Sequence, residues 1–182
     1  MVFVHKNIRL PKQNYLGERS HFLTICCHSR QPLLAEAPII ARLLEILAAE
    51  ASRSSFVVHA YCFMPDHLHL LVQGTSAQSD LMRFVNVFKQ KSAFEYSKKT
   101  GVALWQFKYY DHILRRRDLA ARVMAYIWMN PVRKGLVRAV VDYPFSGSFT
   151  APWKEQERIS VEDWVPPWKR DNGEEKKQKR PG

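Results

Sequence analysis

The sequence predicts an α+β fold, a ferredoxin-like sandwich with a central antiparallel sheet and helices packed on it. Short β-rich runs alternate with longer segments in which apolar residues recur at helical spacing. The order of these segments is β-α-β-β-α-β followed by one more helix, which is the order of the ferredoxin-like motif. A chain of 182 residues is long enough for one domain with a substantial core.

The elements of the first half are predicted from residue type and spacing. Strands are expected at 21–27, 56–63 and 67–73, with a turn at 64–66 that makes a hairpin of the last two. Pro38 opens a helix, because its missing N–H has no partner in a first helical turn anyway. Apolar residues then continue at helical spacing to about Arg53.

The second half repeats this alternation. A helix is expected from Ser79 to Gly101, since glycine readily adopts the left-handed conformation that ends helices. Residues 109–115 can form a fourth strand. Asp118 is a suitable N-cap for a third helix, which is predicted to end near Asn130 because a residue before proline disfavours helical angles.

Composition divides the chain into a flexible N-terminal arm (1–18), a domain (19–150) and an irregular C-terminal extension with a disordered basic tail (151–182). We expect a soluble, cytoplasmic protein without a membrane segment, because no apolar run approaches the roughly 20 residues of a membrane helix and the N-terminus lacks the apolar core of a signal peptide. The three cysteines show no CxxC spacing, so reduced core thiols are expected rather than a zinc site.

Positive charge is concentrated in one part of the chain. The net charge is +11, and residues 81–140 hold thirteen Lys and Arg against three acidic residues, a net charge of +10. Aromatic residues are interleaved with these cations. Such a pattern suits a nucleic acid, whose phosphates take the charge and whose bases stack on rings, although a solvated basic surface would look the same.

Two histidines lie one residue apart in the run 64–72. Because side chains alternate along a strand, His67 and His69 share one face and Leu68 and Leu70 the other. Two imidazoles on one face can hold a divalent cation with open positions for water or phosphate oxygens. The alternative is one core histidine and one surface histidine.

The predicted third helix carries a second set of polar residues. Tyr126 and Asn130 are four residues apart and lie on one stripe, with Arg122 one turn earlier. An amide oxygen of Asn130 would suit Mg or Mn, and a tyrosine needs nearby positive charge to act as a nucleophile. Alternatively, Tyr126 is a half-buried aromatic and Asn130 only terminates the helix.

Four segments in this order resemble the REP-associated tyrosine transposases, which are HUH single-tyrosine transposases of the IS200-like type. They are Met64-Pro65-Asp66 with its His-Leu-His, Trp105-Gln106, the run Tyr109–Ile113 and the run Tyr126–Val137. The resemblance implies a bacterial, nucleoid-associated enzyme that cleaves single-stranded or hairpin DNA through a 5′-phosphotyrosine link, as a monomer or homodimer. It implies a divalent metal on His67 and His69, with Tyr126 as the nucleophile. Asn130, at a position that many relatives in the broader superfamily fill with glutamine, is the expected third ligand of an Mg or Mn ion.

The resemblance leaves other roles open. Tyr109 and Tyr110 are rival nucleophiles, and Asp111 and His112 match the pattern without an assigned role. The basic residues expected to contact DNA are Arg83, Lys89, Lys91, Arg115, Arg116, Arg117, Arg122, Arg133 and Lys134. Two rival functions are a catalytically silent DNA- or RNA-binding protein on the same fold and a hydrolytic phosphodiesterase, which would need a second histidine motif that the sequence lacks.

Overall fold

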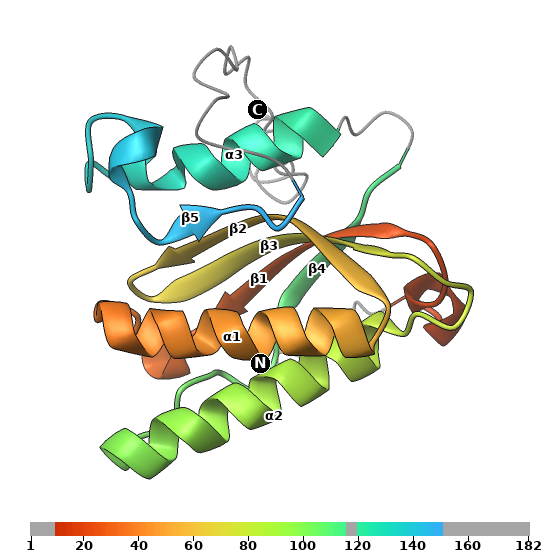
Figure 1. Cartoon of the computed structure of the whole chain (residues 1–182), viewed down its shortest axis with the longest axis horizontal. Coiled ribbons are helices and arrows are strands. Elements are labelled where there is room, and N and C mark those ends of the chain that lie inside the picture. The colour runs from red at the N-terminus through yellow and green to blue at the C-terminus, as the bar shows by residue number, and fades with distance from the viewer. Residues whose placement is uncertain (1–9, 116–119, 151–182) are drawn as a thin grey trace, which may run out of the picture.

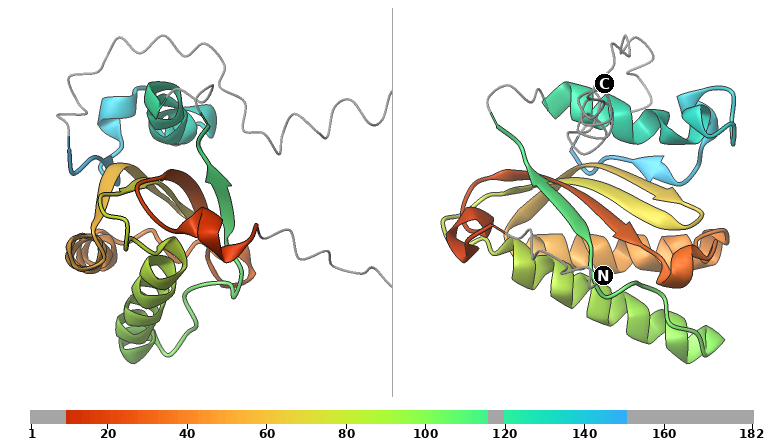
Figure 2. Two further views of the ribbon diagram at one scale, coloured as in Figure 1. Left: turned by 90° about the vertical axis from the view of Figure 1, so that its right-hand side faces the viewer. Right: turned by 180° about the vertical axis from the view of Figure 1, so that it is seen from behind.

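The computed structural model describes residues 10–115 and 120–150. It has five strands, β1 (Ser20–Cys26), β2 (Phe56–Met64), β3 (His67–Gly74), β4 (Tyr110–Ile113) and β5 (Ser146–Gly147). They form one antiparallel sheet in the order β4-β1-β3-β2-β5. The helices α1 (Ala37–Arg53) and α2 (Leu81–Thr100) cover one face, and α3 (Ala120–Arg133) covers the other (Figures 1 and 2). The predicted α+β, ferredoxin-like fold is confirmed.

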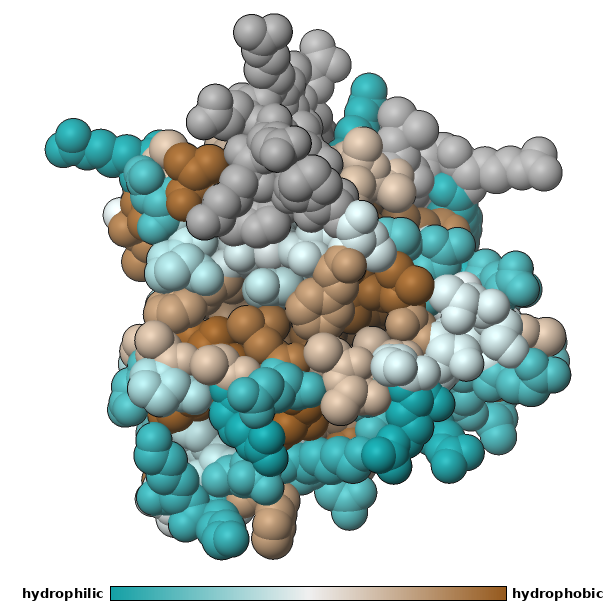
Figure 3. All heavy atoms as spheres, viewed as in Figure 1, coloured by the Kyte–Doolittle hydropathy of each residue, from teal (hydrophilic) through white to brown (hydrophobic). Residues whose placement is uncertain are grey.

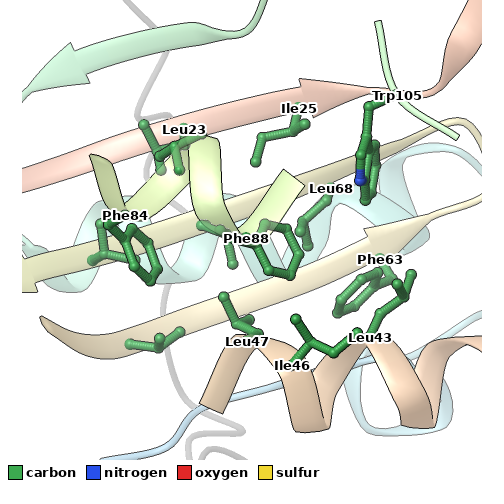
Figure 4. Close-up of a cluster of buried hydrophobic side chains, with 14 of the residues drawn as sticks. Leu23, Ile25, Leu43, Ile46, Leu47, Phe63, Leu68, Phe84, Phe88 and Trp105 are labelled. Atoms are coloured by element: carbon green, nitrogen blue, oxygen red, sulfur yellow. The ribbon is translucent and has the colours of Figure 1, made fainter. Parts of the chain in front are cut away.

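Alternation along the strands divides the interior into two apolar clusters. In the central strand β3, Leu68 and Leu70 pack on the α1 and α2 side, whereas Leu71 packs on the α3 side. The larger cluster brings aliphatic side chains of the strands against Phe84 and Phe88 of α2 (Figure 4). Because helices cover both faces of β3, the histidines of that strand face a second packed layer rather than open solvent.

The ends of α2 follow the sequence closely. The Asp80 side chain accepts a hydrogen bond from the backbone N–H of Arg83 at 3.0 Å, which satisfies one of the free amides of the first turn. Gly101 follows the helix with φ 73°, and its N–H donates to Ser97 O at 2.7 Å. The predicted stop at Gly101 is confirmed.

The predicted end of α3 near Asn130 is wrong, because the helix continues through Pro131 to Arg133. Proline has no N–H to donate to the carbonyl oxygen of Ile127, four residues earlier. The side-chain Nδ2 of Asn130 donates instead to that oxygen at 3.4 Å and to Tyr126 O at 2.7 Å. Because the side chain of Asn130 replaces the missing N–H donor, the helix extends by almost another turn.

The ordered chain also extends beyond the predicted limits of the domain. Residues Lys12–Tyr15 form a 3-10 helix with Tyr15 buried, so this part of the segment predicted as a flexible arm is packed. Gly17 N donates to Ser79 O at 2.9 Å, which fastens the segment beside the start of α2. The rest of the arm (1–9), the Asp118 cap and the whole extension (151–182) lie outside the described residues.

The edge strand β5 was not predicted, because two residues carry no periodicity. It pairs with Tyr61 and Cys62 of β2, and Figure 3 shows a band of apolar residues between α1 and the layer of α3.

The thiols of Cys26, Cys27 and Cys62 are free, as expected. Within the described residues, no helix is long and apolar enough to span a bilayer.

His21 is a buried polar group without a hydrogen-bond partner on either ring nitrogen. Burial, with smaller effects from the charges of Arg19 and His112, lowers its pKa to about 4. The unfolded chain, with a histidine pKa of about 6.5, therefore takes up this proton at a higher pH than the folded protein does. The folded state is favoured above pH 6.5, and this contribution falls as the pH drops towards 4.

We predict that acidification from neutral pH to about 4 costs the protein about 3 kcal/mol of its free energy of unfolding through His21. Urea denaturation at a series of pH values measures this dependence. His21→Phe should flatten the curve, leaving a smaller slope from His67, whose pKa burial also lowers. An equally steep curve in the variant would show that His21 is not the titrating group.

Candidate active site

His67 and His69 meet at the start of β3, on the face that α3 covers. Their Nε2 atoms are 3.0 Å apart, and the two rings are nearly perpendicular, at 82°. His69 is buried, with 5% of its surface exposed, and its ring also contacts Phe22 of β1 at a centroid distance of 5.3 Å. The predicted placement of both imidazoles on one face is confirmed.

Each imidazole is held by a partner on its other nitrogen. Asp66 Oδ1 lies 2.6 Å from His67 Nδ1, and Thr24 Oγ1 lies 2.9 Å from His69 Nδ1. The pairing of β1 with β3 sets Thr24 directly opposite His69. Arg30 donates to the second carboxylate oxygen of Asp66 at 3.1 Å. These contacts fix the orientation of both rings, with their Nε2 atoms 3.0 Å apart.

Electrostatics keep His67 neutral with an available lone pair. Burial lowers the pKa of His67, and the Asp66 carboxylate only partly offsets this, while the charges of Arg30 and Lys134 lower it further. Burial alone would raise the pKa of Asp66, but the hydrogen bond from His67 and the charge of Arg30 lower it overall. An ionised Asp66 accepts the Nδ1 proton, which leaves Nε2 of His67 as an acceptor or a metal ligand.

The paired Nε2 atoms fit a divalent metal ion. In an octahedral site with bonds of about 2.1 Å, two adjacent ligands lie about 3 Å apart, which is the separation of these atoms. No group of three His, Cys, Asp or Glu side chains suited to a metal occurs among the residues that the structure describes. Two imidazoles would therefore leave most coordination positions for an amide, water or phosphate oxygen.

Tyr126 of α3 lies against this pair. Its ring centroid is 6.0 Å from that of His69 and 6.0 Å from that of Phe22. Burial raises the pKa of the phenol, and the charge of Arg133 and a hydrogen bond with the Asn130 side chain act in the opposite direction. Arg133 places its guanidinium 5.0 Å from the ring centroid. The structure thus places the charge of Arg133 near the phenol, where the sequence predicted that of Arg122.

Asn130 is buried one turn after Tyr126, in the position the sequence predicts. Its Nδ2 donates to Tyr126 O and to Ile127 O, the second of which is the carbonyl oxygen that Pro131 cannot pair with. Only the Oδ1 atom is then available as an oxygen ligand. Its role as a third ligand stays a prediction.

Tyr109 and Tyr110, the rival nucleophiles, point to opposite faces of the sheet. Tyr110 pairs with Thr24 and packs on the α3 side, the face of the histidines. Tyr109 packs on the other side, with Lys89 Nζ 5.7 Å from its ring centroid. Of the two, only Tyr110 shares the face of His69.

The predicted DNA-contacting residues separate into two groups. Arg133, at the end of α3, lies 5.0 Å from the ring centroid of Tyr126, and the charge of Lys134 acts on His67. The helix α2, with its basic residues, covers the opposite face of the sheet (Figure 1). Arg115 and Arg122 are exposed, and Arg83 is exposed on α2. Arg116 and Arg117 lie outside the described residues.

Two of the predicted phosphate contacts on α2 are engaged within the protein. Lys91 Nζ lies 2.7 Å from the carboxylate of Glu50, which is only 2% exposed. Lys89 Nζ donates to the carbonyl oxygens of Gln106 and Phe107 at 2.8 and 2.7 Å. A buried carboxylate and two backbone acceptors need these ammonium groups. Both lysines therefore fasten α2 to α1 and to the following loop, and their contact with DNA stays a prediction.

Sequence reasoning missed Thr24, Asp66 and Arg30 as site residues. Asp66 stands directly before His67, so its position in the sequence could have suggested a histidine partner. Thr24 is 45 residues from His69. Its role depends on the register of two strands, which residue spacing does not give.

Comparison with known proteins assigns the family. Residues 19–130 match the family described as IS200-like transposases. The chain belongs to this family. It is 30% identical over 120 residues to a Haemophilus influenzae protein assigned to the REP-associated tyrosine transposases, covering 60% of the chain and 66% of that relative, just under two thirds of its length. It is 23% identical over 135 residues to the REP-associated tyrosine transposase of Escherichia coli, covering 74% and 79%.

A solved structure has the same fold as the present chain. It is a REP-associated tyrosine transposase bound to a REP hairpin, which superposes with a TM-score of 0.64 at 22% sequence identity. The match covers 78% of this chain and 81% of the other. The resemblance inferred from the sequence motifs is thereby confirmed at the level of family and fold.

We predict that the partners on Nδ1 set the metal affinity of the histidine pair. Asp66→Ala and Thr24→Val should each weaken Mn²⁺ binding by about 10- to 100-fold, because the imidazoles lose their orientation and basicity. Isothermal titration of the full chain with MnCl₂ measures the dissociation constant. Glu18→Ala, an exposed acidic change away from the pair, is the control. Unchanged affinity in both variants would contradict the prediction.

Proposed function

We propose that this chain is a metal-dependent single-stranded DNA endonuclease and strand transferase that acts on hairpin DNA through a covalent 5′-phosphotyrosine intermediate. One observation carries the proposal: Tyr126 and the histidine pair come from separate elements and meet on one face of the sheet, with 6.0 Å between the rings of Tyr126 and His69. Membership of the IS200-like transposases supports the same reaction class.

The residues divide the reaction between them. A bond forms from Tyr126 Oη to the phosphorus of the scissile phosphodiester, and the bond from phosphorus to the 3′-oxygen breaks. The phenol gives up its proton and the departing 3′-oxygen takes one, so charge and protons balance. A second 3′-hydroxyl reverses the same step on a new strand. The ester bond is conserved throughout, and no nucleotide triphosphate is consumed.

The donor set indicates how a metal would assist. Held by His67, His69 and the Oδ1 atom of Asn130, an Mg or Mn ion would supply Lewis-acid polarisation of the phosphate. Asp66 and Thr24, which bind the Nδ1 atoms, would orient both imidazoles for such an ion. Arg133 adds a positive charge near the phenol, which favours the phenolate that attacks the phosphorus.

The burial of Tyr126 adds a requirement to this proposal. Tyr126 is 4% exposed, so the proposal requires that the surroundings of its side chain open when DNA binds and let a phosphate reach Oη. Burial also raises the pKa of the phenol, which lowers the fraction of reactive phenolate. The low exposure and the raised pKa together keep the phenol unreactive until DNA binds.

Charge and family indicate the partner. Exposed basic residues lie on α3 and at the end of β4, and the relative of known structure is described with a REP hairpin. We propose a hairpin with a short single-stranded flank, such as a repeated extragenic palindrome, as the substrate. Monomer and homodimer both remain compatible with this role, in a bacterial cytoplasm close to the nucleoid.

We predict that Tyr126→Phe abolishes a covalent protein–DNA adduct, lowering its yield by about a thousandfold or more, because the nucleophilic oxygen is lost. The measurement incubates the protein and labelled hairpins with single-stranded flanks in Mn²⁺ or Mg²⁺ and separates adducts on a denaturing gel. Tyr110→Phe is the matched control, since Tyr110 lies on the same face and should leave the yield unchanged.

Peptide mapping of the adduct identifies the attached residue. An adduct that persists in Tyr126→Phe, or that maps to Tyr110, would remove Tyr126 as the nucleophile. Tight hairpin binding with no adduct from any variant, the wild type included, would favour the catalytically silent binding protein instead.

A further inference from the structure

Phe107 is the most exposed large apolar side chain among the described residues, with 95% of its surface accessible. It stands in the loop between α2 and β4, followed by the exposed Lys108. A phenyl ring exposed to water does not contribute the hydrophobic stabilisation that it would contribute if it were buried. Neighbouring aromatics of the same segment do not behave in this way, since Trp105 is buried and donates its indole N–H to Ser92 Oγ at 2.8 Å.

The backbone that carries Phe107 is fixed. Lys89 Nζ donates to the carbonyl oxygens of Gln106 and Phe107 itself, and Gln106 N donates to Cys26 O at 2.9 Å. Leu104 O accepts from His28 N at 2.8 Å. The loop is thus fastened to α2 and to the end of β1 while the ring points away from the core. A ring on a fixed backbone loses little conformational freedom when a flat ligand stacks on it.

The loop lies at the end of the sheet that carries the histidine pair. Cys26, which accepts the hydrogen bond from Gln106, is the register partner of His67. Arg30, half exposed and bonded to Asp66, belongs to the same end of the sheet. The loop that carries the exposed ring therefore lies at the end of the sheet that holds the candidate metal site, with only β1 between Gln106 and His67.

We propose that Phe107 is a stacking platform for one unpaired base of single-stranded DNA beside the histidine pair, and that Lys108 contacts the neighbouring phosphate. The inference rests on the proposed function for the identity of the ligand. Aromatic rings stack on every base with little sequence preference, and only unpaired bases offer a free face. The platform selects single-stranded over duplex flanks without reading a base sequence.

Fluorescence anisotropy of a labelled hairpin with a single-stranded flank tests the platform in the Tyr126→Phe background, which prevents turnover. Phe107→Ala should weaken binding about tenfold, and Phe107→Leu by a similar factor, whereas Phe107→Trp should retain affinity because it keeps an aromatic face. Phe94→Ala removes a ring that is 64% exposed on α2 and should change nothing. Equal affinity of the Ala variant and the parent, or full affinity of the Leu variant, would overturn the proposal.

A second measurement locates the stacked base. Abasic sites are placed one at a time along the flank: at one position the loss should match that of Phe107→Ala, and the two changes together should cost no more than either alone. Lys108→Ala should reduce the slope of affinity against salt by about one. Additive losses at every position would overturn stacking. Adduct formation by the protein with Tyr126 intact is scored separately, so failure of the platform and failure of the proposed reaction are distinguishable.

Discussion

The pairing of β1 with β3 is the constraint on which the site depends. It sets Thr24 opposite His69 and thereby supplies the hydrogen bond that a buried imidazole needs. A shift of one residue would turn Leu68 and Leu70 towards α3 and the two histidines into the apolar layer under α1 and α2. The burial of that apolar layer thus stabilises this strand register, and the register places Thr24 beside His69.

A single amide links the backbone of α3 to the electrostatics of the site. Asn130 restores the hydrogen bond that Pro131 removes, which allows the helix to run on to Arg133. Only in a continued helix does residue 133 lie two turns from residue 126 on nearly the same stripe. The guanidinium then stands 5.0 Å from the ring of Tyr126. The asparagine therefore serves the site structurally, whether or not its oxygen binds a metal.

Residue patterns predicted the parts of the fold that repeat, because periodicity needs several residues to show. The strands β1 to β4, the helix ending at Gly101 and the common face of His67 and His69 all follow from alternation or helical spacing. The end of α3 was wrong because a local rule about proline ignored a side chain that replaces the missing N–H. The packing of Tyr15 and the contact of Thr24 depend on distant segments, which no local pattern contains.

The large positive charge of the chain overstates how much of it can meet a polyanion. Lys91 neutralises a buried carboxylate, Lys89 binds two carbonyl oxygens, and Arg30 is paired with Asp66. If such a cation moved to bind a phosphate, its buried acceptor would lose its partner. The free energy lost there exceeds the free energy gained from a solvent-screened ion pair at the surface. Sequence charge alone cannot separate cations that hold the fold together from cations that face a ligand. The partners of each cation in the folded chain make that distinction. Here the partners of Lys89 and Lys91 favour the end of α3 and the loop at Phe107 over α2 as the DNA-facing regions.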